Sequence, residues 1–131
     1  MEAMTIPTPG IHHLALRVSD LDRSKDFYLN KLGFPKALEV PGLCIFVVGG
    51  MFIALRAPDE QTPANDAFNP FRIGLDHLAL GCENPEDLVR VAKALNDHGI
   101  ENTGIKRDTT LDKDYVAFKD PDRISWEYYS T

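Results

Sequence analysis

An internal repeat limits the folds open to this chain more than any other feature of its sequence. The heptapeptide GIHHLAL at Gly10–Leu16 recurs as GLDHLAL at Gly74–Leu80, with five identical residues, 64 positions further along the 131-residue chain. A second and weaker match, Leu29–Phe34 with Leu95–Ile100, follows in the same order. Two matches in the same order indicate two copies of one supersecondary unit.

Each copy predicts a strand, then a helix, then three short strands. The first segment of each copy alternates between apolar and other residues, which is typical of a strand with one buried face. A helix follows in each copy, with Ser19 or Asp20 as the first N-cap and Asn84 as the second, and with Gly33 and Gly99 at the ends. The predicted strands are Ile11–Val18, Lys36–Val40, Leu43–Val48 and Met51–Arg56 in the first copy, and Leu75–Cys82, Asn102–Arg107, Tyr115–Lys119 and Ile124–Tyr129 in the second.

These elements predict an α+β fold of two tandem βαβββ modules within one domain, residues 1–131. Module 1 covers about residues 10–56 and module 2 about residues 73–131, and a proline-containing linker at 57–72 joins them. Each module has a single helix, which can cover only one face of its sheet. The other face is therefore free to line a site.

Composition excludes several classes of partner. Asp and Glu number 20 against 14 Lys and Arg, and the net charge of −6 argues against nucleic acid, whose phosphates require a basic surface. No apolar run approaches the ~20 residues that cross a bilayer, and the first residues lack the pattern of a signal peptide. Two cysteines are too few for a disulfide scaffold. We therefore expect a cytoplasmic protein with no nucleic acid or membrane partner.

Three side chains on the free faces form a candidate metal site. His13 and His77 are equivalent in the repeat, and both lie opposite the apolar side of their strands. On the last strand Glu127 alternates with the apolar Trp126, so Glu127 is expected on the face of the histidines. Two imidazoles and one carboxylate suit one Fe(II) or Mn(II) ion, with Zn(II) and Ni(II) as alternatives. Taken singly, a histidine on a strand is more often a packing residue, and a terminal glutamate is usually solvated.

The motifs resemble the vicinal oxygen chelate superfamily, which includes glyoxalase I, fosfomycin-resistance thiol transferases, bleomycin-resistance proteins and extradiol dioxygenases. The matching segments are Ile11–Ser24, Phe27-Tyr28, Leu32–Phe34 and Phe118–Asp122, followed by Glu127. The resemblance implies a cup of mostly antiparallel sheet with the helices outside, around one divalent metal ion. It places the ligands at His13, His77 and Glu127. It also implies a small-molecule substrate and a homodimer.

Departures from the family patterns narrow the expected reaction. Glyoxalase I has a fourth ligand on the last strand of the first module, where the repeat places Ala54, with Leu55 as the near alternative, and neither side chain can bind a metal. A dioxygenase-like enzyme is therefore favoured over glyoxalase I, with Glu127 able to act as a base. Dioxygenases and fosfomycin enzymes usually have a tyrosine at the position of Ala117, and Arg123 replaces the glycine of the usual Asp-Pro-Asp-Gly turn. The alternative is a metal-free, bleomycin-resistance-like protein that sequesters a ligand.

Five further residues are candidates for substrate binding. Arg17 and Arg56 share the predicted faces of the site and can pair with a carboxylate or phosphate. Tyr115 and Lys119 lie on the face of Ala117, and Phe52 can supply an apolar wall. For the arginines, a position at a solvated rim is an equally good interpretation.

Overall fold

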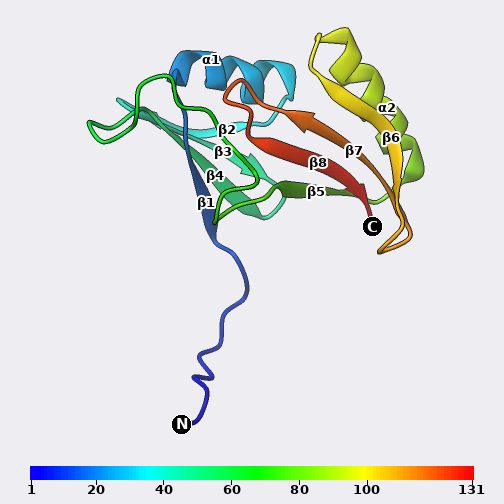
Figure 1. The fold of residues 1–131 in the computed structure, drawn as a ribbon, viewed down its shortest axis with the longest axis horizontal. Coiled ribbons are helices and arrows are strands. Elements are labelled where there is room, and N and C mark those ends of the chain that lie inside the picture. Colours follow the sequence, from blue (N-terminus) through cyan, green and yellow to red (C-terminus); the bar gives the residue numbers. More distant parts are fainter. The chain divides into compact units, whose positions relative to one another are not determined.

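The computed structural model describes all residues from Met1 to Thr131, which form two compact units, Met1–Pro58 and Asp59–Thr131. The elements of the first unit are β1 (His13–Arg17), α1 (Leu21–Lys25), the π-helical turn η1 (Asp26–Lys31), β2 (Lys36–Val40), β3 (Leu43–Val48) and β4 (Met51–Arg56). Those of the second are β5 (Leu78–Cys82), α2 (Pro85–Asp97), β6 (Asn102–Asp108), β7 (Lys113–Lys119) and β8 (Ser125–Ser130) (Figure 1). The predicted βαβββ repeat and the α+β class are confirmed.

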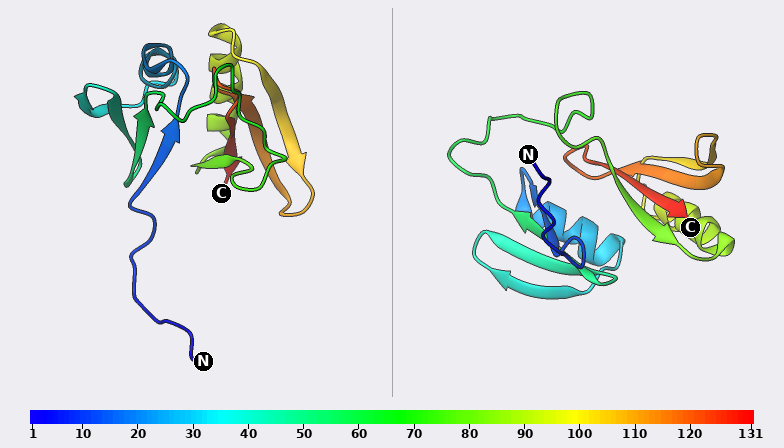
Figure 2. Two further views of the ribbon diagram at one scale, coloured as in Figure 1. Left: turned by 60° about the vertical axis from the view of Figure 1, so that its left-hand side comes forward. Right: turned by 90° about the horizontal axis from the view of Figure 1, so that it is seen from below.

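The two sheets have equivalent topologies. Their strand orders are β1-β4-β3-β2 and β5-β8-β7-β6, and in each sheet the first strand pairs in parallel while the other two pairings are antiparallel. One helix packs along one face of each sheet, as Figure 2 shows for α1 and α2 within their own units. The opposite face of each sheet is left uncovered by a helix.

The alternation predicted for the strands is observed. On β1 and the residue after it, Leu16 and Val18 are buried, whereas His13, Ala15 and Arg17 are exposed. In the second unit Val116, Phe118 and Trp126 face α2 and are almost completely buried. Since side chains alternate across a strand, this core directs the intervening residues of β7 and β8 to the free face.

The first helix differs from an ordinary α-helix. Asp20 caps it by accepting a hydrogen bond from the backbone N–H of Arg23, at 3.1 Å. After Lys25 the chain continues as a π-helical turn, in which the N–H of Leu32 donates to the carbonyl of Phe27 at 2.9 Å. This wider turn accommodates two consecutive buried aromatic residues, Phe27 and Tyr28. An apolar pattern of period 3.6 does not reveal a π-turn.

Three strands begin later than predicted, β8 by one residue, at Ser125, and β1 and β5 by more. β1 starts at His13 instead of Ile11, and β5 starts at Leu78 instead of Leu75. For β5 the reason lies in its partner, because Leu78 pairs with Trp126 and β8 begins only one residue earlier. The residues before Leu78 therefore have little partner strand to pair with, and His77 lies just outside the strand.

The turn between β7 and β8 contains the arginine that departs from the family pattern. Asp120 Oδ1 accepts hydrogen bonds from the N–H groups of Asp122 and Ile124, both at 2.8 Å. Arg123 has a φ of 69°, in the left-handed region that favours glycine. Its guanidinium donates to Glu101 Oε2 at 2.5 Å, a contact that glycine cannot make.

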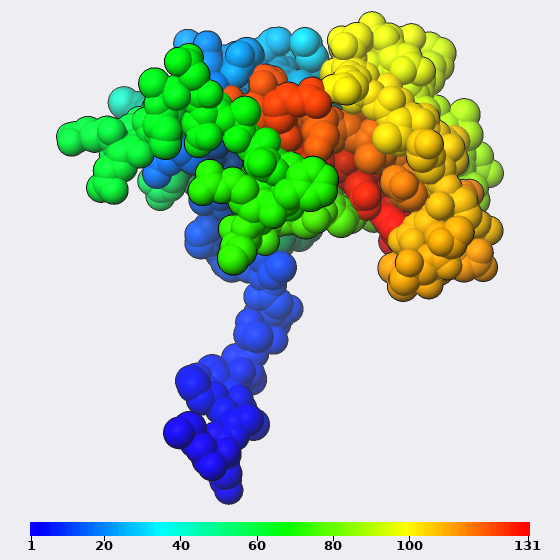
Figure 3. Space-filling view, viewed as in Figure 1, coloured from blue at the N-terminus to red at the C-terminus, as the bar shows by residue number.

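Residues 59–72, predicted as a linker, belong to the second unit. The N–H of Phe68 donates to the carbonyl of Asp122 at 2.9 Å. In Figure 3 this green segment lies beside the orange turn between β7 and β8, and the exposed N-terminal residues extend away from their own unit. None of the helices is both long and apolar enough to cross a membrane.

Candidate metal and substrate site

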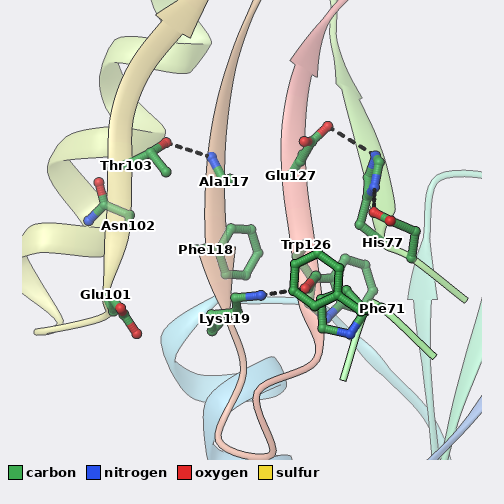
Figure 4. A pocket seen from close by; sticks show the side chains of 13 residues that line it. Phe71, His77, Glu101, Asn102, Thr103, Ala117, Phe118, Lys119, Trp126 and Glu127 are labelled. Atoms are coloured by element: carbon green, nitrogen blue, oxygen red, sulfur yellow. Dashed lines mark hydrogen bonds and ion pairs between the residues drawn. The ribbon is translucent and has the colours of Figure 1, made fainter. Parts of the chain in front are cut away.

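The free face of the second sheet brings His77 and Glu127 together. β5 runs parallel to β8, with Ala79 opposite Glu127, so His77 and Glu127 lie on the same face. The Nε2 of His77 is 3.3 Å from Oε1 of Glu127, and the two side chains point toward one another in Figure 4. The histidine side chain is 42% exposed and the glutamate 19%, so the pair is reachable from solvent.

Asp76 holds the other nitrogen of the same imidazole. Its Oδ1 lies 2.6 Å from Nδ1 of His77. A carboxylate at this position can accept the Nδ1 proton of an imidazole and so leave Nε2 as the nitrogen available to a metal ion. Asp76 was not among the residues predicted from the sequence. Its signal was a carboxylate directly before a candidate ligand histidine.

Small residues flank Glu127 on both sides. Its neighbours across the sheet are Ala79 on β5 and Ala117 on β7. Neither methyl group fills the space above the sheet, and His77 and Glu127 line two cavities, of about 330 Å³ and 610 Å³. The alanine at position 117, where a tyrosine is usual in the dioxygenases and fosfomycin enzymes, thus leaves this space open.

The smaller cavity, shown in Figure 4, contains one lysine. Lys119 donates a hydrogen bond to Ser125 Oγ at 2.5 Å. The edge of the cavity next to β6 is shaped by a β-bulge between Asn102 and Ile105, which directs Thr103 Oγ1 to accept the N–H of Ala117 at 3.1 Å. Such bulges are frequent beside functional sites.

The larger cavity has an aromatic wall. Tyr115 and Tyr129 are opposite one another on β7 and β8, with their ring centroids 6.3 Å apart. The hydroxyl of Tyr129 donates to Asp108 Oδ2 at 2.8 Å. Burial and this hydrogen bond raise the pKa of Tyr129 to about 12, while the tyrosine hydroxyl lowers the pKa of Asp108. Tyr129 is therefore a neutral hydroxyl at physiological pH and does not serve as a base. Tyr129 was not among the residues predicted from the sequence.

In the first unit, His13 lies at the equivalent end of β1. Its Nδ1 is 2.9 Å from Nδ1 of His12, and its strand partner is Phe52, which is 40% exposed. A cavity of about 400 Å³ adjoins both histidines and is otherwise lined by apolar side chains, namely Ala37, Leu38, Ile45, Phe52 and Ala54.

The strand registers test the equivalence of Ala54 and Glu127. Ala15 pairs with Ala54 in the first sheet, and its repeat partner Ala79 pairs with Glu127 in the second. The two positions are therefore equivalent, and the first unit has a methyl group where the second has a carboxylate.

Arg17 and Arg56 are opposite one another in the parallel β1–β4 pair, and both are exposed. Arg17 donates to the carbonyl of Ala57 at 2.6 Å. Neither arginine forms an ion pair with a carboxylate within its unit, so two like charges lie side by side on the face of His13.

The predicted site residues thus fall into two groups. His77, Glu127, Tyr115 and Lys119 lie on one face in the second unit, and His13, Arg17, Phe52 and Arg56 lie on the equivalent face in the first. Within neither unit do three His, Cys, Asp or Glu side chains gather closely enough to hold a metal ion. The ligand set predicted from the repeat would need donors from both units.

The repeated βαβββ topology defines a class of protein, and the sequence matches its family model. The chain belongs to the glyoxalase/bleomycin resistance protein/dioxygenase superfamily, whose model matches residues 10–128. The resemblance found in the motifs is confirmed. Members of this superfamily include metal-dependent enzymes that bind small-molecule substrates.

Individual relatives span most of the chain. The sequence of this chain is 33% identical to that of the uncharacterized protein YwkD of Bacillus subtilis, over 92% of this chain and 95% of that protein. It is 27% identical to the metallothiol transferase FosB of Staphylococcus saprophyticus, over 92% of this chain and 76% of that protein. A glyoxylase/bleomycin resistance protein/dioxygenase domain from Frankia sp. EAN1pec has a solved structure with a TM-score of 0.80 and 28% identity, covering 95% of this chain and 93% of that one.

Proposed function

We propose that this protein is a divalent-metal-dependent enzyme acting on a small oxygen-bearing substrate, with one ion held by His13, His77 and Glu127. The observation that carries the proposal is the 3.3 Å separation between His77 Nε2 and Glu127 Oε1. Two donors about 2.1 Å from one ion lie about 3.0 Å apart at a right angle and about 3.4 Å apart at the tetrahedral angle. The observed separation suits two ligands of a single ion.

Asp76 supports the same role for His77. Metal-binding histidines almost always donate their second N–H to a carboxylate or carbonyl, which fixes the tautomer and orients the ring. Asp76 makes this contact at 2.6 Å.

His13 is the third proposed ligand because it is the repeat equivalent of His77 and is exposed on the free face of its sheet. Two imidazoles and a carboxylate, with the remaining positions open to substrate, favour Fe(II) or Mn(II), and Zn(II) or Ni(II) would also fit.

The bound ion would supply Lewis acidity, which polarises an oxygen of the substrate. Glu127 is also the proposed catalytic residue, because its carboxylate could accept a proton from a substrate once it no longer binds the ion. Tyr129 would contribute a wall, since its proton is held on the hydroxyl by the contact with Asp108. For substrate binding we propose Arg17, Phe52, Arg56, Tyr115 and Lys119.

The favoured reaction is dioxygenase-like and not that of glyoxalase I. Ala54 offers no fourth ligand, so a proton shuttle between two metal-binding carboxylates has no second member. A thiol transfer like that of the named relative FosB is the second candidate, favoured by 27% identity over 92% of this chain. Both reactions accommodate a three-ligand centre.

A homodimer is also proposed. The edge strand β2 is exposed along its whole length, including the apolar Leu38 and Val40. An open edge of this kind is available for pairing with a second copy. Light scattering across a tenfold range of concentration tests this, and a monomer throughout would contradict it.

The proposed function is tested by activity together with ligand variants. Oxygen consumption with a panel of catechols and conjugate formation from fosfomycin and a thiol are measured with added Fe(II) or Mn(II). We expect one of these two reactions to proceed with a turnover that depends on the added metal. This turnover should be lost in His77→Ala and in Glu127→Ala. His98→Ala, at the C-cap of α2, is the matched control and should keep full activity.

The sequestering alternative makes the opposite prediction. A metal-free binding protein would show no metal-dependent turnover with any substrate, and its stability would not respond to Mn(II) in either the wild type or the variants. That pair of results would overturn the enzymatic proposal.

A further inference from the structure

We propose that Lys119 and Ser125 form a subsite for an oxyanion of the substrate, a carboxylate, phosphonate or phosphate group, beside the proposed metal centre. The inference rests on the proposed function, because the proposed metal centre is what would position the rest of the substrate. It adds the chemical class, since a neutral diol or a simple carbonyl compound would leave this subsite empty.

The strand register places the subsite. Lys119 is opposite Ser125, and the next pair on the same face is Ala117 opposite Glu127. Lys119 donates to Ser125 Oγ at 2.5 Å, and both residues line the cavity of about 330 Å³ that His77 and Glu127 also line. In Figure 4 the lysine and Glu127 reach into the same cavity from neighbouring strands.

Charge is what directs the subsite toward an anion. The carboxylates of this cavity already have partners other than Lys119: Asp76 and Glu127 contact the imidazole of His77, and Glu101 contacts Arg123 at 2.5 Å. Lys119 has no carboxylate within ion-pair distance, and its partner is a neutral hydroxyl. An ammonium group partly withdrawn from water favours an anionic partner, and the cavity leaves room for one.

Ser125 completes the arrangement. It is 9% exposed, and its hydroxyl accepts from Lys119, so its own proton remains available to a second acceptor. An oxyanion can accept from the ammonium and the hydroxyl at once. No partner of this kind exists at the equivalent place in the first sheet, where Val47 is opposite Phe52.

The spacing limits the size of the substrate. Successive pairs on one face of a strand are separated by two residues, which corresponds to about 7 Å. A group bound by Lys119 therefore lies a few bonds from oxygens held at Glu127 and His77. The inferred substrate is a small acid that carries a chelating oxygen pair at one end and an anionic group at the other.

The first arm of the test needs no metal. Methylphosphonate is titrated into the isotope-labelled protein while backbone amide shifts are followed by NMR. We expect saturable, millimolar shifts centred on Lys119 and Ser125, absent in Lys119→Met and retained in Lys119→Arg. Lys93→Met, which removes an exposed lysine of α2, is the control and should behave as the wild type.

The second arm uses the protein loaded with Mn(II). Acetohydroxamate offers two chelating oxygens, and phosphonoacetohydroxamate adds a phosphonate one methylene away. Calorimetry should show the phosphonate compound binding about 10-fold to 100-fold more tightly in the wild type, with that advantage lost in Lys119→Met. The affinity for acetohydroxamate should be the same in both proteins, which shows that the variant is folded and binds metal.

The arms separate the two proposals. If neither hydroxamate binds in a Mn(II)-dependent way but methylphosphonate still shifts Lys119 and Ser125, the subsite stands and the metal proposal fails. If the hydroxamates bind but the phosphonate adds less than twofold, or if Lys119→Met leaves its advantage intact, the subsite is refuted.

Discussion

Replacing Asp76 by asparagine tests whether the carboxylate–histidine contact serves a metal ligand. Asp76 Oδ1 lies 2.6 Å from His77 Nδ1, and the Asp76→Asn change would keep the size of the side chain while removing its charge. Loss of a contact of this kind typically weakens metal affinity 10-fold to 100-fold. At about 1.4 kcal/mol for each factor of ten, the expected loss of binding free energy is about 1.4 to 2.7 kcal/mol.

The assay is a competition titration of Mn(II) or Zn(II) between the protein and a chromophoric chelator of known affinity. Asp97→Asn is the matched control, because Asp97 is an exposed carboxylate that contacts Lys93 on α2. We expect this control to bind metal as the wild type does. Affinity of Asp76→Asn within twofold of the wild type, or an equal loss in Asp97→Asn, would refute the role assigned to Asp76.

Three further predictions concern stability. The hydroxyl of Ser24 is buried without a hydrogen-bond partner, so Ser24→Ala should raise the free energy of unfolding in urea by about 1 kcal/mol; a lower midpoint would contradict this. Arg56→Glu should remove the repulsion from Arg17 and stabilise by about 0.5 kcal/mol at low ionic strength, with a smaller gain in 0.5 M salt; an unchanged or lower stability would count against it. The hydrogen bond from Lys25 is the main cause that lowers the pKa of Glu39 to about 2, so its stabilisation is present above pH 4.5 and is lost as the pH falls toward 2. Acid titrations should therefore show a larger loss in the wild type than in Glu39→Gln, and parallel curves would refute the assignment.

The repeat made the fold predictable. Matching heptapeptides at Gly10 and Gly74 indicated two equal modules, and alternation along the strands identified their buried faces. The structure confirms both, including the register that makes Ala54 the equivalent of Glu127. Strand ends were predicted less well, because the start of β5 depends on where β8 begins and not on its own residues.

The site could be predicted only in outline. The alternation of side chains between the two faces of a strand was enough to predict that His77 and Glu127 lie on one face of the sheet. Asp76 and Ser125 were missed because their roles come from contacts with His77 and Lys119, which alternation cannot reveal. Arg123 was recognised as a departure, but its contact with Glu101 joins a turn to the residue just before β6 across 22 residues of sequence.

The most direct test of the central claim is a crystal structure of the protein grown with Mn(II), with data collected at the manganese absorption edge. We expect a single strong anomalous peak within about 2.0 to 2.3 Å of a ring nitrogen of His13, Nε2 of His77 and a carboxylate oxygen of Glu127. A peak bound by other side chains, or no peak near His77 and Glu127 at saturating Mn(II), would contradict it.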